Sequence, residues 1–87
     1  MAKYRVLIKR SAAREIEALD QKKDRRRIVA RILALADEPR PVGIEKLAGE
    51  SNRYRLRVGG YRIVYSISDK EHQVIVVRVV DRKDVYR

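Results

Sequence analysis

A Gly-Gly pair between two β-like segments is the feature that most restricts how this chain can fold. Residues 54–58 and 61–65 read as two strands, and Gly59-Gly60 separates them. A two-residue Gly-Gly loop favours the primed turns that join antiparallel strands. The register that follows from this loop pairs Arg57 directly with Arg62.

This register sorts the side chains of the hairpin onto two faces, because side chains alternate along a strand and cross-strand partners share a face. One face is predicted to carry Tyr54, Leu56, Ile63 and Tyr65, and the other Arg55, Arg57 and Arg62. Like charges that lie directly opposite each other destabilise a sheet. A fold alone does not need such a pair, so the arrangement indicates an anion-binding site.

Two amphipathic helices are predicted before the hairpin. The first lies at about 11–19, where apolar residues recur at helical spacing and Ser11 is expected to be the N-cap. The second is expected to be capped by Asp20 or Asp24. It ends before Pro39, since proline disfavours the helical conformation in the residue that precedes it.

The remaining strands complete a βααβββ order. Residues 3–9 alternate as a half-buried strand does, and the β-branched run 73–80 is typical of a strand that is central or covered on both faces. Residues 40–52 are expected to be a connector. We therefore expect one α+β domain over 1–87, with two layers and both helices packed on one face of a mainly antiparallel sheet. The order of the strands does not follow from the sequence.

Charge and composition restrict the partners. Lys and Arg total 22 against 12 Asp and Glu, which gives a formal net charge of +10. This excess favours a polyanionic partner, whether nucleic acid, an acidic protein or an anionic membrane, although a merely basic soluble protein is an alternative. A membrane is the weakest of these, because no predicted helix combines a basic face with bulky apolar anchors. The basic cluster at 22–27 is interpreted mainly as a solvated helix face.

The absence of cysteine excludes disulfides and thiolate metal sites, and fits the cytoplasm. The N-terminus lacks the apolar core of a signal peptide, and the longest apolar run is too short to span a bilayer. No Asp/Glu/His cluster is apparent, so neither a metal nor another cofactor is expected. The single histidine, His72, lies in a predicted polar turn and is interpreted as a solvated loop residue.

The planar guanidinium group of arginine forms bidentate hydrogen bonds with phosphate oxygens, so the face that carries the three arginines suits a phosphodiester. In RNA the 2′-hydroxyl can attack its own 3′-phosphate, a reaction that needs positioning, charge neutralisation and proton transfer. Two residues near the C-terminus are further candidates: Arg82 for phosphate and Tyr86 for stacking on a base. Alternatively, Arg82 is solvated and Tyr86 is a packing anchor.

Three segments carry a resemblance to a known family: 47–49, 54–65 and 82–86, with sequences LAG, YRLRVGGYRIVY and RKDVY. In these segments the chain resembles the RelE toxins of bacterial and archaeal toxin–antitoxin pairs. The resemblance implies a ribosome-dependent endoribonuclease that cleaves mRNA in the 30S A site by attack of the 2′-hydroxyl. The products would be a 2′,3′-cyclic phosphate and a 5′-hydroxyl. It also implies an acidic RelB-like antitoxin that wraps the toxin and determines its oligomeric state.

The same resemblance implies catalytic roles for five residues. Arg55 and Arg62 would stabilise the phosphorane, and Arg57 would lie near the attacking 2′-hydroxyl. Arg82 would assist the leaving oxygen, and Tyr86 would orient or stack on the nucleotide. A guanidinium gives up its proton very reluctantly and is a poor proton acceptor, so Arg57 is not expected to be the general base, and the residue that fills this role stays open.

The sequence leaves two other functions open. The ParE branch of the same superfamily shares the hairpin but inhibits DNA gyrase without cutting nucleic acid. A basic module that binds nucleic acid without catalysis would show strongly salt-dependent binding. One local feature also bears on the site, because Asp81 precedes Arg82 and is expected to hold it in an ion pair.

Overall fold

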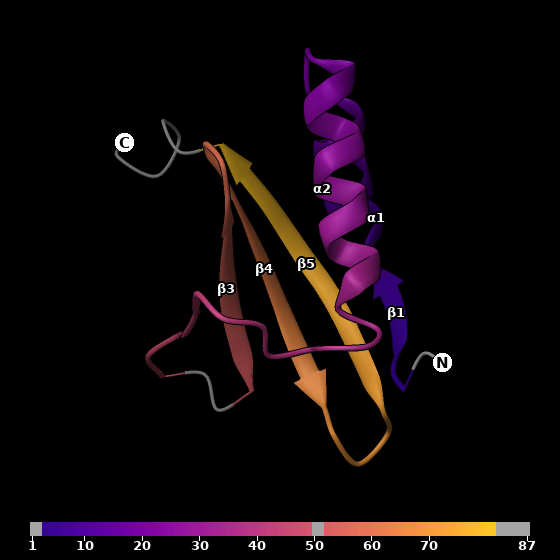
Figure 1. Ribbon diagram of the computed structural model, residues 1–87, viewed down its shortest axis with the longest axis vertical. Coiled ribbons are helices and arrows are strands. Elements are labelled where there is room, and N and C mark those ends of the chain that lie inside the picture. The colour runs from indigo at the N-terminus through magenta and orange to yellow at the C-terminus, as the bar shows by residue number, and fades with distance from the viewer. Residues whose placement is uncertain (1–2, 50–51, 82–87) are drawn as a thin grey trace.

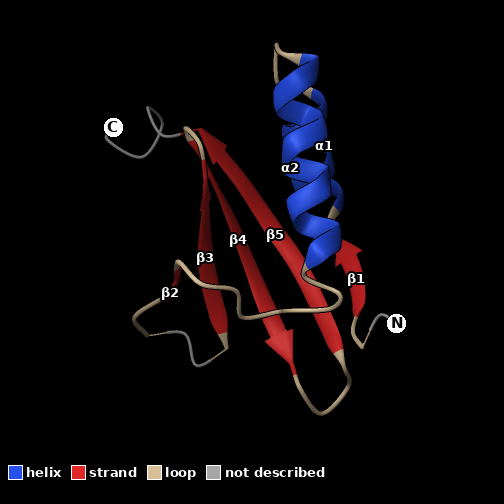
Figure 2. Ribbon diagram, in the orientation of Figure 1, coloured by secondary structure: helices blue, strands red, loops and turns tan. Residues whose placement is uncertain are grey.

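The computed structural model describes residues 3–49 and 52–81 (Figure 1). In chain order the elements are β1 (Arg5–Ile8), α1 (Arg10–Glu17), α2 (Lys22–Ala34), β2 (Ile44–Lys46), β3 (Arg53–Val58), β4 (Tyr61–Ser68) and β5 (Gln73–Asp81). Figure 2 shows the two helices side by side in one layer and the strands in another. In the described part of the chain, no helix has the length and apolar character needed to cross a membrane.

The five strands form one sheet in the order β1-β5-β4-β3-β2. β1 pairs with β5 in parallel, and every other neighbouring pair is antiparallel. The predicted α+β class, with both helices on one face of a mainly antiparallel sheet, is therefore confirmed. β5 lies inside the sheet, between β1 and β4, as its β-branched composition indicates.

The prediction that residues 40–52 form only a connector is wrong, because β2 lies within it. Ile44 pairs with Leu56 and Glu45 with Arg55, so this short strand extends the sheet beyond β3. Three residues are too few to show a periodic pattern, and the strand is defined by its pairing with β3. Figure 1 shows the chain crossing from the end of α2 toward this far edge of the sheet.

Both predicted N-caps are also wrong. The N-cap of α1 is Lys9, which has extended backbone angles and makes no side-chain capping bond, and Ser11 lies inside the first turn. The N-cap of α2 is Gln21, again without a side-chain bond. Asp24 lies in the first turn of α2, where a carboxylate interacts favourably with the helix dipole.

The core lies between the helices and one face of the sheet. It is built mainly from aliphatic side chains of both layers, which are almost fully buried: Ala12, Ile16, Ile28, Ile32, Leu35, Leu56, Val58, Ile63, Tyr65, Ile67, Val74, Val76 and Val79. Tyr65 is the largest of them, and its hydroxyl donates a hydrogen bond to the carbonyl oxygen of Pro39 at 2.8 Å. Burial raises the pKa of Tyr65 to about 12.

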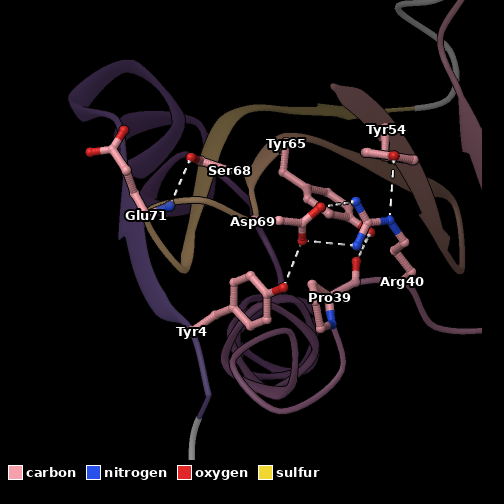
Figure 3. Close-up of polar contacts among 8 residues, drawn as sticks. All are labelled: Tyr4, Pro39, Arg40, Tyr54, Tyr65, Ser68, Asp69 and Glu71. Carbon is pink, nitrogen blue, oxygen red and sulfur yellow. Dashed lines mark hydrogen bonds and ion pairs between the residues drawn. The ribbon is translucent and has the colours of Figure 1, made fainter. Parts of the chain in front are cut away.

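An ion pair between Arg40 and Asp69 fastens the α2–β2 connector to the β4–β5 turn (Figure 3). The Arg40 Nη2 and Nη1 atoms lie 2.9 and 3.2 Å from the Oδ2 and Oδ1 atoms of Asp69. The Tyr4 hydroxyl donates to Asp69 at 2.6 Å, and the guanidinium lies 5.4 Å from the centre of the Tyr54 ring. We call these four residues the Arg40 clasp. It fixes the segment that leads into β2.

Candidate functional site

The β3–β4 hairpin has the register that the Gly-Gly loop predicts. Arg57 lies opposite Arg62, and Tyr54 lies opposite Tyr65. Gly59 has a φ of +59°, the left-handed region that glycine adopts without strain. The two glycines of the loop therefore set the register of the hairpin, and this register places Arg57 opposite Arg62.

The two predicted faces of the hairpin are confirmed. Leu56 and Ile63 are 1% and 0% exposed in the core. Arg55, Arg57 and Arg62 stand on the opposite face and retain solvent contact. Because both helices contribute to the core side, the arginines remain accessible from outside.

A pocket of about 280 Å³ brings the three arginines together. Its lining consists of Arg55 and Arg57 from β3, Arg62 from β4, and Gly43 and Glu45 from the β2 region. A water molecule has about 30 Å³ in the liquid, so a phosphate-sized anion fits. Three guanidinium groups around one pocket form a site that is suited to a phosphodiester.

Sequence reasoning missed Glu45, the carboxylate that lines this pocket. Its side chain is 68% exposed and forms an ion pair with Arg55, its cross-strand partner. The hydrogen bond from Arg55 lowers the pKa of Glu45, and the charges of Arg62 and Arg57 lower it further. The only sequence signal was the position of Glu45 between an apolar residue and a lysine in the presumed connector. This alternation indicates a strand only when β2 is known to pair with β3, which places Glu45 opposite Arg55.

No cluster of three or more His, Cys, Asp or Glu side chains that could hold a metal ion occurs within residues 3–49 and 52–81. His72 lies in the β4–β5 turn, as predicted, and is exposed. The centres of its ring and of the Tyr4 ring lie 5.4 Å apart, with the two ring planes nearly perpendicular. It is thus a turn residue in contact with the Arg40 clasp rather than part of the arginine pocket.

A second concave surface lies on the helical layer. This groove of about 510 Å³ has a largely apolar lining, and Lys22, Arg25 and Arg26 contribute basic side chains to it. Val29 and Leu33, which also line it, are 36% and 59% exposed. The cluster at 22–27, predicted to be mainly a solvated face, therefore flanks an apolar groove.

The sequence pattern of one family, described as the ParE toxin of the type II toxin–antitoxin system parDE, matches residues 6–86. The chain belongs to this family. The match spans nearly the whole chain, and it confirms the predicted membership of the RelE/ParE toxin superfamily. No curated protein sequence matches the toxin.

Several solved toxin structures share the fold. The archaeal RelE–RelB complex from Pyrococcus horikoshii contains a chain that is 29% identical, with a TM-score of 0.82 over 92% of this toxin and 96% of that chain. A chain of the RelBE2 complex from Mycobacterium tuberculosis is 29% identical, with a TM-score of 0.80 over 92% of this toxin and 99% of that chain. The isolated Escherichia coli RelE toxin is 26% identical, with a TM-score of 0.76 over 95% of this toxin and 90% of that chain. Two of these three structures are toxin–antitoxin complexes.

Two of the predicted site residues, Arg82 and Tyr86, lie outside the described residues, as does the predicted ion pair of Asp81 with Arg82. The last residue of β5, Asp81, pairs with Tyr61, and Val80 pairs with Arg62. The described part of the toxin therefore ends beside the strand that carries Arg62.

Proposed function

We propose that this toxin is a ribosome-dependent endoribonuclease that cleaves mRNA in the ribosomal A site. The observation that carries the proposal is the convergence of Arg55, Arg57 and Arg62 on one pocket of the uncovered sheet face. Attack of a 2′-hydroxyl on the adjacent phosphate builds negative charge on the phosphorane. Preorganised positive groups stabilise that charge, and a binding face positions the nucleotide. The ribosome as target places this activity in the cytoplasm.

The proposed roles divide the reaction among five residues. Arg55 and Arg62 stabilise the phosphorane, and Arg57 lies near the attacking hydroxyl. Arg82 assists the leaving 5′-oxygen, and Tyr86 stacks on or orients the nucleotide. β5 ends at Asp81 and pairs with β4, the strand that carries Arg62. The position of this last described residue supports the roles proposed for the two C-terminal residues.

The proposed partner is an acidic antitoxin of the RelB kind, which binds the basic surface and folds as it binds. The RelE–RelB complexes among the similar structures support an antitoxin partner, and the net charge of +10 supports its acidity. The groove with Lys22, Arg25 and Arg26 suits an acidic segment with an apolar stripe. Leu33→Glu should therefore weaken co-purification with the product of an adjacent acidic reading frame, whereas Val42→Glu, at a fully exposed position, should not. Equal retention by both variants would count against the groove.

The ParE family match favours a second candidate, inhibition of DNA gyrase without cleavage of nucleic acid. Primer extension on a reporter mRNA in a translating extract, beside a gyrase supercoiling assay, separates the two functions. We expect cuts within A-site codons and undisturbed supercoiling. Blocked supercoiling with intact mRNA would replace the proposed function by the second. If the toxin binds RNA in a salt-dependent way but neither cuts mRNA nor blocks supercoiling, it is a nucleic-acid-binding module without catalysis.

A further inference from the structure

The proposed reaction needs a group that removes the proton of the attacking 2′-hydroxyl. The three arginines of the pocket cannot supply it, because a guanidinium stays protonated at any physiological pH. Gly43 has no side chain. Of the described residues that line the pocket, Glu45 is thus the one with a proton-accepting side chain.

We propose that the carboxylate of Glu45 is the general base that takes the proton from the attacking 2′-hydroxyl. This inference rests on the proposed ribonuclease function. In the step, a bond forms between the 2′-oxygen and phosphorus while the bond from phosphorus to the 5′-oxygen breaks. The 2′-hydroxyl proton passes to Glu45, and the leaving 5′-oxygen takes a proton from water.

The placement of Glu45 in the sheet supports this role. It stands on β2, directly across from Arg55 on β3, so the two side chains share the uncovered face of the sheet. Its side chain is 68% exposed, whereas that of Arg55 is 32% exposed. A substrate that enters the pocket therefore meets the carboxylate and the guanidinium together, with the base next to a phosphate-binding group.

The Glu45–Arg55 ion pair also supplies a means of activation. A phosphodiester offers Arg55 a competing anionic partner, and Arg–phosphate pairs are strong and geometrically specific. Arg55 and the charges of Arg62 and Arg57 now hold the pKa of Glu45 below its usual range. When a bound phosphate takes up these charges, Glu45 loses its partner and its pKa rises. Substrate binding thus frees the carboxylate and makes it more basic.

A carboxylate that merely occupies Arg55 in the free toxin would behave differently. Its removal would free Arg55, tighten RNA binding and leave cleavage unchanged or faster. A general base contributes about 10²–10⁴-fold to a rate. Loss of the base would slow the chemical step by such a factor, even where binding is as tight as in the wild type.

The test is single-turnover cleavage of A-site mRNA on purified ribosomes at saturating toxin, measured across a range of pH. Glu45→Gln should be at least about 100-fold slower and should lose the rise of the rate with pH that a titrating carboxylate gives. Lys46→Gln, next to it on β2, should cleave as the wild type does. Added imidazole should accelerate cleavage by Glu45→Ala but not by Arg62→Ala. This comparison separates the loss of a proton acceptor from general damage to the site. It also provides the test if Glu45→Gln folds poorly.

Cleavage by Glu45→Gln within about threefold of the wild type, with the same pH dependence, would overturn the role of Glu45 and leave the proposed function intact. Failure of imidazole to rescue Glu45→Ala would also count against it. Absence of cleavage by the wild type would overturn the ribonuclease function itself, and this inference with it.

Discussion

Arg57 and Arg62 are direct cross-strand partners in the β3–β4 hairpin, on the face of the sheet that the helices leave uncovered. The nearby carboxylate of Glu45 forms its ion pair with Arg55. The pocket therefore combines three guanidinium groups with one carboxylate, and its charge is unbalanced in the absence of an anion. This local repulsion is a cost to the free toxin that a bound phosphate relieves.

Arg57→Gln should make the free toxin more stable. Removal of one of two opposed like charges raises the free energy of unfolding by about 0.2–1 kcal/mol at low ionic strength. The gain should shrink as salt screens the repulsion. Urea denaturation at low and high salt measures it, with Lys46→Gln as the control, because Lys46 lies opposite the uncharged Tyr54. A loss of stability on Arg57→Gln would show that this pair is not repulsive.

Gly59→Ala should cost about 1–2 kcal/mol, whereas Gly60→Ala should be tolerated. Gly59 has a φ of +59°, where a Cβ is strained, and the new Cβ would lie 3.1 Å from Nη1 of Arg27. A Cβ at Gly60 meets nothing within 4 Å. Denaturation of the two variants under the same conditions compares them. Equal effects would mean that the left-handed conformation of Gly59 does not hold the turn.

Tyr65→Phe should destabilise the toxin by about 1–3 kcal/mol, because the carbonyl of the buried Pro39 loses its hydrogen-bond donor. Tyr61→Phe is the matched control. Its hydroxyl donates to Asp24 at 3.0 Å in a part-buried position that water can replace more easily. The free energy of unfolding should therefore fall more for the first variant. A neutral Tyr65→Phe would contradict the role of this bond in anchoring the connector.

The Arg40 clasp should give the toxin a specific sensitivity to acid. Arg40, and then Tyr4, lowers the pKa of Asp69 from 3.8 to about 2. Since the folded pKa is below the unfolded one, the contribution is fully present above about pH 4 and is lost as the pH falls toward 2.

Asp69→Asn should therefore be less stable than the wild type at neutral pH, and should lose less stability between pH 4 and 2. Thermal unfolding across that range measures the slopes. Asp37→Asn serves as the control, because Asp37 is exposed and lies outside the Arg40 clasp. Parallel slopes for Asp69→Asn and the wild type would exclude the clasp as a source of acid sensitivity.

Features encoded by local sequence were predictable. The hairpin register follows from two adjacent glycines and the alternation around them, so these residues alone predict the pairing of Arg57 with Arg62 and the arginine face. The two helices follow from apolar spacing. Their caps were mispredicted, because Ser11 has the right chemistry for a cap but lies one residue inside α1.

Features that depend on distant pairing were not predictable. β2 exists because Glu45 and its neighbours pair with β3, and the parallel β1–β5 contact joins the two ends of the described chain. The partners in the Arg40 clasp, Arg40 and Asp69, are 29 residues apart. Glu45 was missed for the same reason, since nothing local places a connector carboxylate beside Arg55.

The central claim is that the arginine pocket stabilises the scissile phosphate of mRNA. The most direct test is the single-turnover rate of A-site cleavage by the wild type and Arg62→Ala, with the ends of the product identified and Arg31→Ala as a control for charge alone. We predict a 2′,3′-cyclic phosphate and a 5′-hydroxyl from the wild type. Arg62→Ala should remain folded and cut about 10²–10³-fold more slowly. A folded Arg62→Ala toxin that cuts at the wild-type rate would contradict the account.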